Sequence, residues 1–361
     1  MRKFPPKKFS ALKSFCSYKS LIIYLLLTQG EVTVQKTQQE QQQNNNNINI
    51  PINQTGSVQH NSIYHFHAAK CPQKHGGIAI VQMVGDSNYM NASVWNAAHS
   101  MRCYCKMRGY HLYQFDKTGK LVNEVSDAAP ANGSAKQCVA HTNFINKRHC
   151  LVLEMLKYYT NVVHIDADTG VVNPSQCLED FINPEVDLHF LLRDHKNEVQ
   201  IGHYVVKNTT TTKQFLIFKF ISGKLDFASE QGELQLLISE TFLPVDQHSK
   251  CKAEQQKSFK NFKLARCLIS SLRAYESGQK RVLLHSRGQT FVRDGWPNGF
   301  NWSQKDLTFH AMKHADDMVF RRKLRPEDCE NDIWVIPSKK DLYVDSIQKM
   351  KEKWEHSIKF G

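Results

Sequence analysis

Short apolar runs recur along the chain after residue 77, and stretches with apolar positions at helical spacing separate them. The first run, residues 78–84, ends at Gly85 and Asp86 and reads as a buried strand followed by a loop. Apolar side chains then recur at helical spacing from Val94 to Cys105, and residues 110–115 form another apolar run. The pattern predicts a strand, a helix and a second strand, which together make a β-α-β unit.

The same alternation continues through the rest of the folded part. A helix is predicted over residues 147–159, and the apolar run of residues 162–165 leads directly into Asp166-Ala167-Asp168. Further elements are predicted as strands over 188–192, 200–206 and 282–285 and as helices over 213–220 and 232–239. Alternating strands and helices are typical of α/β proteins, so we expect a mainly parallel central sheet flanked by helices.

Residues 1–30 have the layout of a secretory signal. Six basic residues lie within the first 20 positions, and the apolar run of residues 21–27 follows them. This run is shorter than the roughly 20 apolar residues of a membrane span, which favours a cleaved signal peptide. A signal-anchor that attaches the chain to a membrane through residues 20–28 is the first alternative, and a buried helix of the fold is the second.

The next segment, residues 31–70, is rich in Gln and Asn and has few side chains to bury. Burial of such a segment does not offset the entropy lost on ordering it, so we expect a disordered stalk. The predicted folded domain then covers residues 71–361.

Cysteines and glycosylation acceptors agree with the predicted signal. Nine of the ten cysteines lie downstream of the apolar run, where an oxidising lumen would pair most of them and leave one free. Five Asn-X-Ser/Thr acceptors begin at Asn53, Asn91, Asn132, Asn208 and Asn301. Together these features predict a protein of the secretory pathway, in the Golgi lumen or membrane or secreted.

The formal net charge of +13 raises the question of nucleic-acid binding. Outside the basic N-terminus the Lys and Arg residues are scattered, and no RNP-like, zinc-finger or helix-turn-helix pattern is present. We therefore expect no nucleic-acid partner.

Asp166 and Asp168 are the strongest candidates for chemistry. In open α/β sheets ligands bind beyond the carboxyl ends of the strands, and the pair comes directly after a predicted buried strand, as Asp86 does. Two carboxylates one residue apart can hold a hard cation such as Mn²⁺ or Mg²⁺ and leave room for phosphate oxygens. A polar turn without a ligand is the alternative interpretation of Asp-X-Asp.

A metal-dependent phosphatase is a rival enzyme with the same architecture. There the first Asp after a strand is the nucleophile, the second is the acid, and Thr or Val stands at the fourth onward position. This chain has Gly170 at that position. A phosphatase also needs a Gly-Asp metal motif late in the chain, after the Asp-X-Asp, whereas Gly85-Asp86 comes before it. The sequence therefore places a phosphatase second.

The segment from Lys147 to Pro174 resembles a family. Its core, Val162-Val163-His164-Ile165-Asp166-Ala167-Asp168-Thr169-Gly170, is similar to a nematode-expanded domain of unknown function in the GT-A glycosyltransferase superfamily. That domain in turn resembles the yeast and plant galactosyl-, mannosyl- and xylosyltransferases. The likeness extends from about Ile78 to Lys313 and includes the motifs Gly202-His203-Tyr204, Glu230-Gln231-Gly232 and His310-Ala311-Met312-Lys313.

The resemblance implies a GT-A-like fold and a metal-dependent, configuration-retaining transfer of a hexose. The donor is expected to be a UDP- or GDP-hexose and the acceptor a glycan or glycoprotein. The implied residues are Asp166, Asp168 and His310 for the metal, Asp166, Val84, Asp86, Lys147, Arg148 and Lys313 for the donor, and Glu230 and Gln231 for catalysis near the acceptor.

The chain departs from the family pattern at two of these motifs. Ala311 and Met312 follow His310 where similar sequences often have Gly and Trp, and Glu230 replaces a more usual Asp. A lumenal or secreted binding protein that keeps the fold without transferring sugar is therefore a further alternative. His310 also has a structural interpretation as one of 17 histidines, and Glu230 has one as a helix start.

Overall fold

The computed structural model describes residues 63–65, 70–72, 77–85, 92–125, 138, 144–193, 198–221, 230–256, 262–275, 281–285, 290–295, 306–312, 329 and 333–335. These residues all belong to one compact unit, Gln59–Gly361. The predicted signal lies outside the described residues, as does most of the predicted stalk. Within the stalk range, β1 (Ile63–His65) pairs antiparallel with β12 (Ile333–Val335), so at least these three residues are part of a sheet.

The strands predicted from the apolar runs lie in one large sheet. In the described part of the chain this sheet has seven strands in the order β4-β3-β2-β5-β8-β7-β9. Their bounds are β2 Ile78–Gly85, β3 His111–Asp116, β4 Leu121–Val125, β5 Asn161–Ile165, β7 Leu188–Arg193, β8 Glu198–Lys207 and β9 Val282–His285. The middle strand β5 is buried along its whole length, as a strand covered on both faces must be.

The expectation of a mainly parallel sheet was wrong, because the sheet is mixed. β2 runs parallel to β3 and β5, and β7 runs parallel to β9, whereas the pairs β3·β4, β5·β8 and β7·β8 are antiparallel. Parallel neighbours need a crossover of a dozen or more residues. Only residues 194–197 separate β7 from β8, so these two strands form an antiparallel pair.

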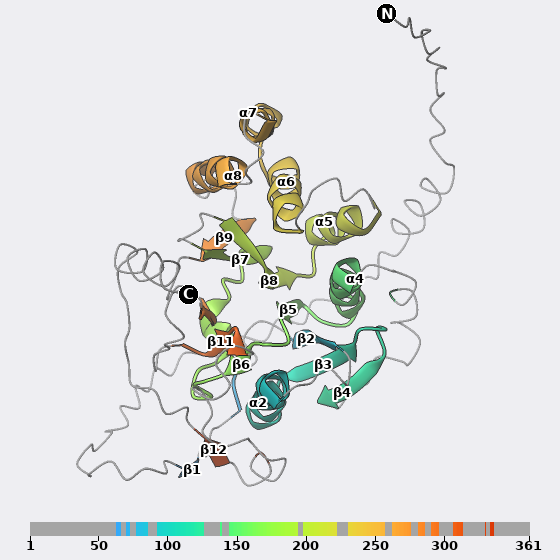
Figure 1. The fold of residues 1–361 in the computed structure, drawn as a ribbon, viewed down its shortest axis with the longest axis vertical. Coiled ribbons are helices and arrows are strands. Elements are labelled where there is room, and N and C mark those ends of the chain that lie inside the picture. The colour runs from blue at the N-terminus through green and yellow to red at the C-terminus, as the bar shows by residue number, and fades with distance from the viewer. Residues whose placement is uncertain are drawn as a thin grey trace, which may run out of the picture. The chain divides into compact units, whose positions relative to one another are not determined.

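Both faces of this sheet are covered (Figure 1). One face packs against α4 (Phe144–Met155), α5 (Thr210–Ile221), α6 (Glu230–Phe242) and α8 (Phe262–Tyr275), and α7 (Val245–Gln256) packs on α6 and α8. The other face packs against α2 (Ala92–Arg108). Helix α2 ends at Arg108, and the next residue, Gly109, has a φ of 81°, which lets the Tyr110 amide bond the Cys105 carbonyl at 3.0 Å.

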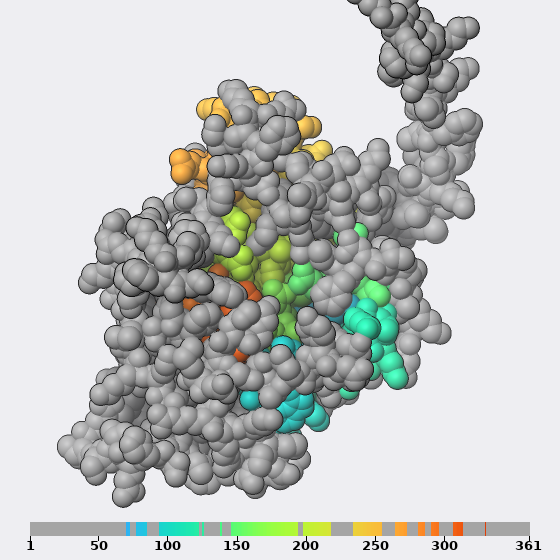
Figure 2. Space-filling view, in the orientation of Figure 1, coloured from blue at the N-terminus to red at the C-terminus, as the bar shows by residue number. Residues whose placement is uncertain are grey.

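A second, small sheet lies on the α2 side. Its order is β10-β11-β6, with β6 Gly170–Val171, β10 Val292–Asp294 and β11 Thr308–His310. β6 begins two residues after Asp168 and pairs antiparallel with β11, with Gly170 opposite Phe309 and Val171 opposite Thr308. Figure 2 shows a face on which residues from the middle of the chain (green) lie next to residues near 310 (orange-red). The small sheet thus brings two distant parts of the sequence together.

The disulfides match the predicted pairing of most downstream cysteines. Four bonds form, Cys71–Cys177, Cys103–Cys329, Cys138–Cys150 and Cys251–Cys267, and Cys105 is a buried free thiol. Among the described residues, none of the helices combines the length and the apolar character that a membrane crossing requires.

One of the predicted glycosylation acceptors is engaged in the fold. The Nδ2 atom of Asn208 donates to the carbonyls of Leu156 and Tyr159 at 2.6 and 3.3 Å, and so ties the end of β8 to the segment after α4. This nitrogen is the atom that would carry a glycan, so the fold argues against modification at Asn208. The other four acceptors lie outside the described residues.

Candidate metal centre

Asp166 and Asp168 lie in a tight loop between β5 and β6. The Asp166 amide bonds the Gly202 carbonyl of β8 at 3.0 Å, and the Thr169 amide bonds the Asp166 carbonyl at 3.1 Å. Gln82 of β2, which is fully buried, lies with its Nε2 atom 3.4 Å from the carbonyl oxygens of both Asp166 and Thr169. Neighbouring strands therefore fix the loop backbone, and the loop leaves β5 at its carboxyl end, as expected for a ligand site.

His310 reaches this loop from the small sheet. Its Nε2 atom lies 3.5 Å from Oδ1 of Asp168 and 3.9 Å from Oδ2 of Asp166. The Met312 amide bonds the Asp168 carbonyl at 2.9 Å, which holds the residues after His310 against the loop. The structure thus brings together the three residues predicted as metal ligands.

Asp294 orients His310. The two residues are register partners in the parallel pair β10·β11, and Oδ1 of Asp294 lies 3.3 Å from Nδ1 of His310. A carboxylate at this distance favours a proton on Nδ1 and leaves the lone pair of the neutral ring on Nε2, the atom that faces the two aspartates. The other oxygen of Asp294 accepts a 2.9 Å hydrogen bond from Nε of Arg193, so the orienting carboxylate is itself held.

The carboxylates also set the charge of the site. Burial alone would lower the pKa of His310, but the hydrogen bond to Asp294 and the negative charges of Asp168, Asp294 and Asp166 outweigh it and raise that pKa above its usual value. The site therefore favours a positive charge between Nε2 of His310 and the carboxylates of Asp166 and Asp168.

Two residues of β8 shape the space around Asp166. A Cβ atom on Gly202 would lie 1.9 Å from Oδ2 of Asp166, so only glycine leaves room for this carboxylate. The next residue, His203, is fully buried, and its ring centroid lies 4.6 Å from that of His310. Burial first, and then the nearby His310 and His164, lower the pKa of His203 well below its usual value, so its imidazole is neutral.

The two basic residues predicted to bind the donor differ in their contacts. Arg148 of α4 forms an ion pair of 2.5 Å with Oδ1 of Asp166, so it belongs to the site. Nζ of Lys147 donates to the carbonyls of Lys117 and Thr118, in the turn after β3, at 3.0 and 3.3 Å. Lys147 therefore fastens this turn to α4.

Glu230 and Gln231 are the first two residues of α6, and their side chains lie outside what the structure describes. One turn later, Nε2 and Oε1 of Gln235 bond the carbonyl and amide of Val199 at 2.9 and 3.3 Å. Val199 precedes Gln200, whose Nε2 atom lies 3.2 Å from Nδ1 of His310. The start of α6 is thus tied to the strand that borders the metal centre.

Of the remaining predicted donor residues, Val84 belongs to the part of the chain that the structure describes. Val84 is a buried residue of β2, the neighbour of β5 in the sheet. Asp86 and Lys313 lie just beyond the described residues, after β2 and after Met312.

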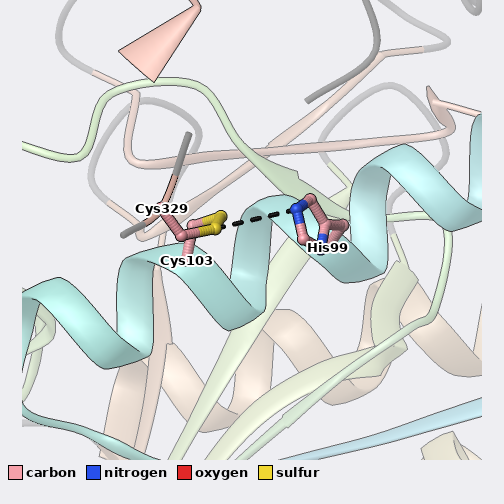
Figure 3. A group of neighbouring side chains, drawn as sticks. All are labelled: His99, Cys103 and Cys329. Carbon is pink, nitrogen blue, oxygen red and sulfur yellow. Dashed lines mark hydrogen bonds between the residues drawn. A yellow bond between two sulfur atoms is a disulfide. The ribbon is translucent and has the colours of Figure 1, made fainter. Parts of the chain in front are cut away.

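A second group with metal-ligand atoms combines two residues of α2 with one from near the end of the chain (Figure 3). It consists of His99, Cys103 and Cys329, with Nε2 of His99 3.6 Å from Sγ of Cys329. The two sulfur atoms are joined in a disulfide and so lack the thiolates that bind metal. A third group, Cys71, Cys177 and Glu179, also contains a disulfide. Among the described residues, the group at Asp166 has the chemistry of a cation site.

The sequence did not reveal two residues of this centre. Asp294 was hidden because its partner His310 lies on another short strand, and strands of three residues have no readable pattern. His203 belongs to a motif of the family resemblance, but the motif alone assigns it no role. The antiparallel register of β5 and β8, which sets His203 opposite Ile165, is the signal that places it.

The arrangement fits a divalent cation. The donor set combines two carboxylates with a histidine whose far nitrogen is oriented by a third carboxylate, and this is how proteins prepare a metal-ligating imidazole. The glycine next to His203 clears the space for one carboxylate.

No curated protein matches the chain. Among solved structures, one similar chain is a glycosyltransferase involved in the glycosylation of the major capsid of the virus PBCV-1. It is 12% identical, covers 67% of this chain and 97% of its own, and has a TM-score of 0.37, which is too low to bear on function. Residues 101–326 match a family of proteins of unknown function. This match agrees with the resemblance to a domain of unknown function, but it does not test the nematode expansion or the GT-A superfamily. The chain belongs to this family, DUF273.

Proposed function

We propose that this protein is a metal-dependent hexosyltransferase of the secretory pathway. In this proposal Asp166, Asp168 and His310 hold Mn²⁺ or Mg²⁺, and the cation binds the diphosphate of a UDP- or GDP-hexose. The hexose passes to a hydroxyl of a glycan or glycoprotein with retention of configuration, as in the transferases that the sequence resembles.

The observation that carries the proposal is the position of His310. Its Nε2 atom faces oxygens of both aspartates at 3.5 and 3.9 Å, although a long stretch of chain separates it from them. A polar turn needs no such partner. A histidine with its Nδ1 atom against a carboxylate and its Nε2 atom against two others supports a cation site.

A transferase is favoured over a phosphatase by the contact of Asp166. A phosphatase of this architecture needs the first aspartate as a free nucleophile. Here Oδ1 of Asp166 is bound by Arg148 at 2.5 Å, and its other oxygen faces His310. Both oxygens are thus directed to charged or ligand-binding partners, which suits a carboxylate that holds a cation.

Each residue of the centre has a distinct part in the proposed reaction. A bound cation would neutralise the negative charge that builds on the nucleoside diphosphate as the bond to the sugar breaks. Asp294 keeps the Nε2 atom of His310 directed at the aspartates, and Arg148 fixes the rotamer of Asp166. Glu230 and Gln231, at the start of α6, are the candidates for the acceptor side.

The disulfides support the proposed compartment. Eight of the nine cysteines downstream of the N-terminal apolar run are paired. Such bonds form and persist in the endoplasmic reticulum and beyond, and are rare in the cytosol. A Golgi or secreted protein is therefore the proposed destination, whether residues 20–28 are cleaved or anchor the chain.

The test is nucleotide-sugar binding and turnover with a matched set of variants. Purified protein with Mn²⁺ is screened against UDP- and GDP-hexoses by thermal shift, because a ligand of the folded state raises the melting temperature. We expect at least one donor to bind and to be hydrolysed slowly without an acceptor. Asp168→Ala should abolish both effects, whereas Asp246→Ala, on the exposed start of α7, should leave them unchanged.

The outcomes separate the alternatives. Metal-dependent binding without turnover or transfer would indicate the sugar-binding protein without transferase activity. Hydrolysis of simple phosphate monoesters in place of nucleotide sugars would indicate the phosphatase. Absence of any donor or metal binding by the folded wild type would end the proposal.

A further inference from the structure

His203 has an environment that the proposed three-ligand site does not explain. It lies on β8 next to Gly202, with its side chain fully buried and its ring edge against His310. Nε2 of His203 lies 2.7 Å from Oγ1 of Thr169, which is the residue that follows Asp168. The ring is thus fixed by the Asp-X-Asp loop itself.

The other nitrogen of this ring is the informative one. Among the described residues, Nδ1 of His203 has no hydrogen-bond partner, although the side chain is fully buried. Buried polar atoms are nearly always satisfied, so an orphan nitrogen calls for a partner of another kind. An imidazole that is hydrogen-bonded through one nitrogen and open at the other has the form of a metal ligand.

The position of the ring agrees with this. Ligand-capable atoms of Asp166, His203 and His310, one from each residue, all lie within 4.8 Å of one another. We propose that His203 is a further ligand of the cation, so that two imidazoles and two carboxylates hold it. The proposal rests on the cation site described under Proposed function and adds a ligand to it.

A second imidazole changes which cation the site prefers. Mg²⁺ takes oxygen ligands in nearly all of its protein sites, whereas imidazole suits first-row transition metals. The four-residue set therefore selects Mn²⁺ and its heavier neighbours Co²⁺ and Zn²⁺ over Mg²⁺. A site with His310 as its single imidazole would discriminate less.

The experiment counts histidine nitrogens on the bound metal. Full-length protein with ¹⁴N- or ¹⁵N-labelled histidine is loaded with Mn²⁺ and measured by pulsed electron paramagnetic resonance, and the Kd is measured by calorimetry. We expect two coupled histidine nitrogens in the wild type and one in His203→Gln, with a Kd raised about ten-fold or more. Mg²⁺ affinity should change less than Mn²⁺ affinity in the same variant.

The matched control is His189→Gln. His189 is also a buried histidine of the central sheet, but its contacts are His285 at 2.9 Å and the Asn183 carbonyl at 3.2 Å. It should keep both nitrogen couplings and the wild-type Kd. If His203→Gln does not fold, two histidine nitrogens in the wild type still require an imidazole besides His310, and among the described residues His203 has a ligand atom within 4.8 Å of those of Asp166 and His310.

The outcomes distinguish the two proposals. A wild-type spectrum with one histidine nitrogen would overturn the role of His203 and leave the three-ligand site standing. A folded protein that binds no Mn²⁺ would overturn both. Two nitrogens in the wild type, with one lost in His203→Gln, would establish the four-residue set.

Discussion

Ala311 takes a backbone conformation that alanine rarely adopts. Its φ is 76°, which makes it a positive-φ residue other than glycine in the described part of the chain, and it directly follows His310. The left-handed region costs an L-residue roughly 1–2 kcal/mol, because Cβ approaches the following carbonyl oxygen. The pattern that the sequence resembles has glycine at this position, and here an alanine takes the glycine geometry.

The strain predicts that Ala311→Gly has almost no effect on stability. Relief of about 1–2 kcal/mol opposes the loss of one buried methyl group, about 0.8 kcal/mol, and the greater freedom of glycine in the unfolded chain, about 0.4–1 kcal/mol. Ala97 is also fully buried, but it lies inside α2. There the same change should cost about 2 kcal/mol, since helix propensity and burial add.

Urea unfolding of both alanine variants measures the difference. A cost at Ala311 equal to that at Ala97 would contradict the strain. If Ala311→Gly also leaves Mn²⁺ affinity unchanged, then the departure from the family pattern at this position does not disable the site.

At the scale of elements, the segment that carries Asp294 and His310 depends on one buried ion pair. Arg293 of β10 bonds both carboxylate oxygens of Asp306, the residue shortly before β11, at 2.6 to 2.9 Å. Both side chains are about 3% exposed. Removal of one partner would take this opposite charge away from a buried ion, which is strongly destabilising.

We therefore expect Asp306→Ala to lower the free energy of unfolding by about 3–5 kcal/mol. The double variant Arg293→Met/Asp306→Leu should cost less than the single one, because no buried charge is left. As a control, Asp246→Ala removes an exposed carboxylate at the start of α7 and should cost under about 1 kcal/mol. If the cost of the double variant in urea unfolding equals the sum of the costs of Arg293→Met and Asp306→Leu, then the two side chains are not energetically coupled.

The elements also show which parts of the fold a sequence can predict. Strands such as β5 were predictable because burial on both faces requires an unbroken apolar run. Their directions were not, because direction depends on which connections contain a helix. Helix α7 was missed because it has few apolar residues, and Cys251, which ties it to α8, acts through a disulfide with no local pattern. In the candidate metal centre, Asp166 and Asp168 were predicted from a contiguous motif and His310 from the family resemblance, whereas Asp294 has no such pattern and was missed.

Over the whole molecule, positive charge and disulfide bonds have opposite effects on the stability of the folded state. The chain carries a net charge of +13 with its 17 histidines neutral, so acidification makes an already basic protein more positive. The disulfides Cys71–Cys177 and Cys103–Cys329 close long loops, with separations of 106 and 226 residues, and so restrict the unfolded chain. Stability at acid pH then depends on which histidines can take up protons in the folded state.

His189 is a histidine that resists protonation. Burial, together with the adjacent His285, lowers its pKa to about 3, while the ordinary value is 6.5. The neutral form is favoured in the folded state, so the unfolded chain binds one more proton between these two pH values. Stability is therefore full above pH 6.5 and declines as the pH falls toward 3, by about 1.4 kcal/mol per pH unit for this group.

His189→Gln should remove that part of the slope in urea unfolding measured from pH 7 to pH 4. The difference in free energy of unfolding between His189→Gln and the wild type at pH 8 measures the packing cost of the substitution, and this difference is subtracted at every pH. If the two pH profiles then run parallel, His189 does not control acid stability.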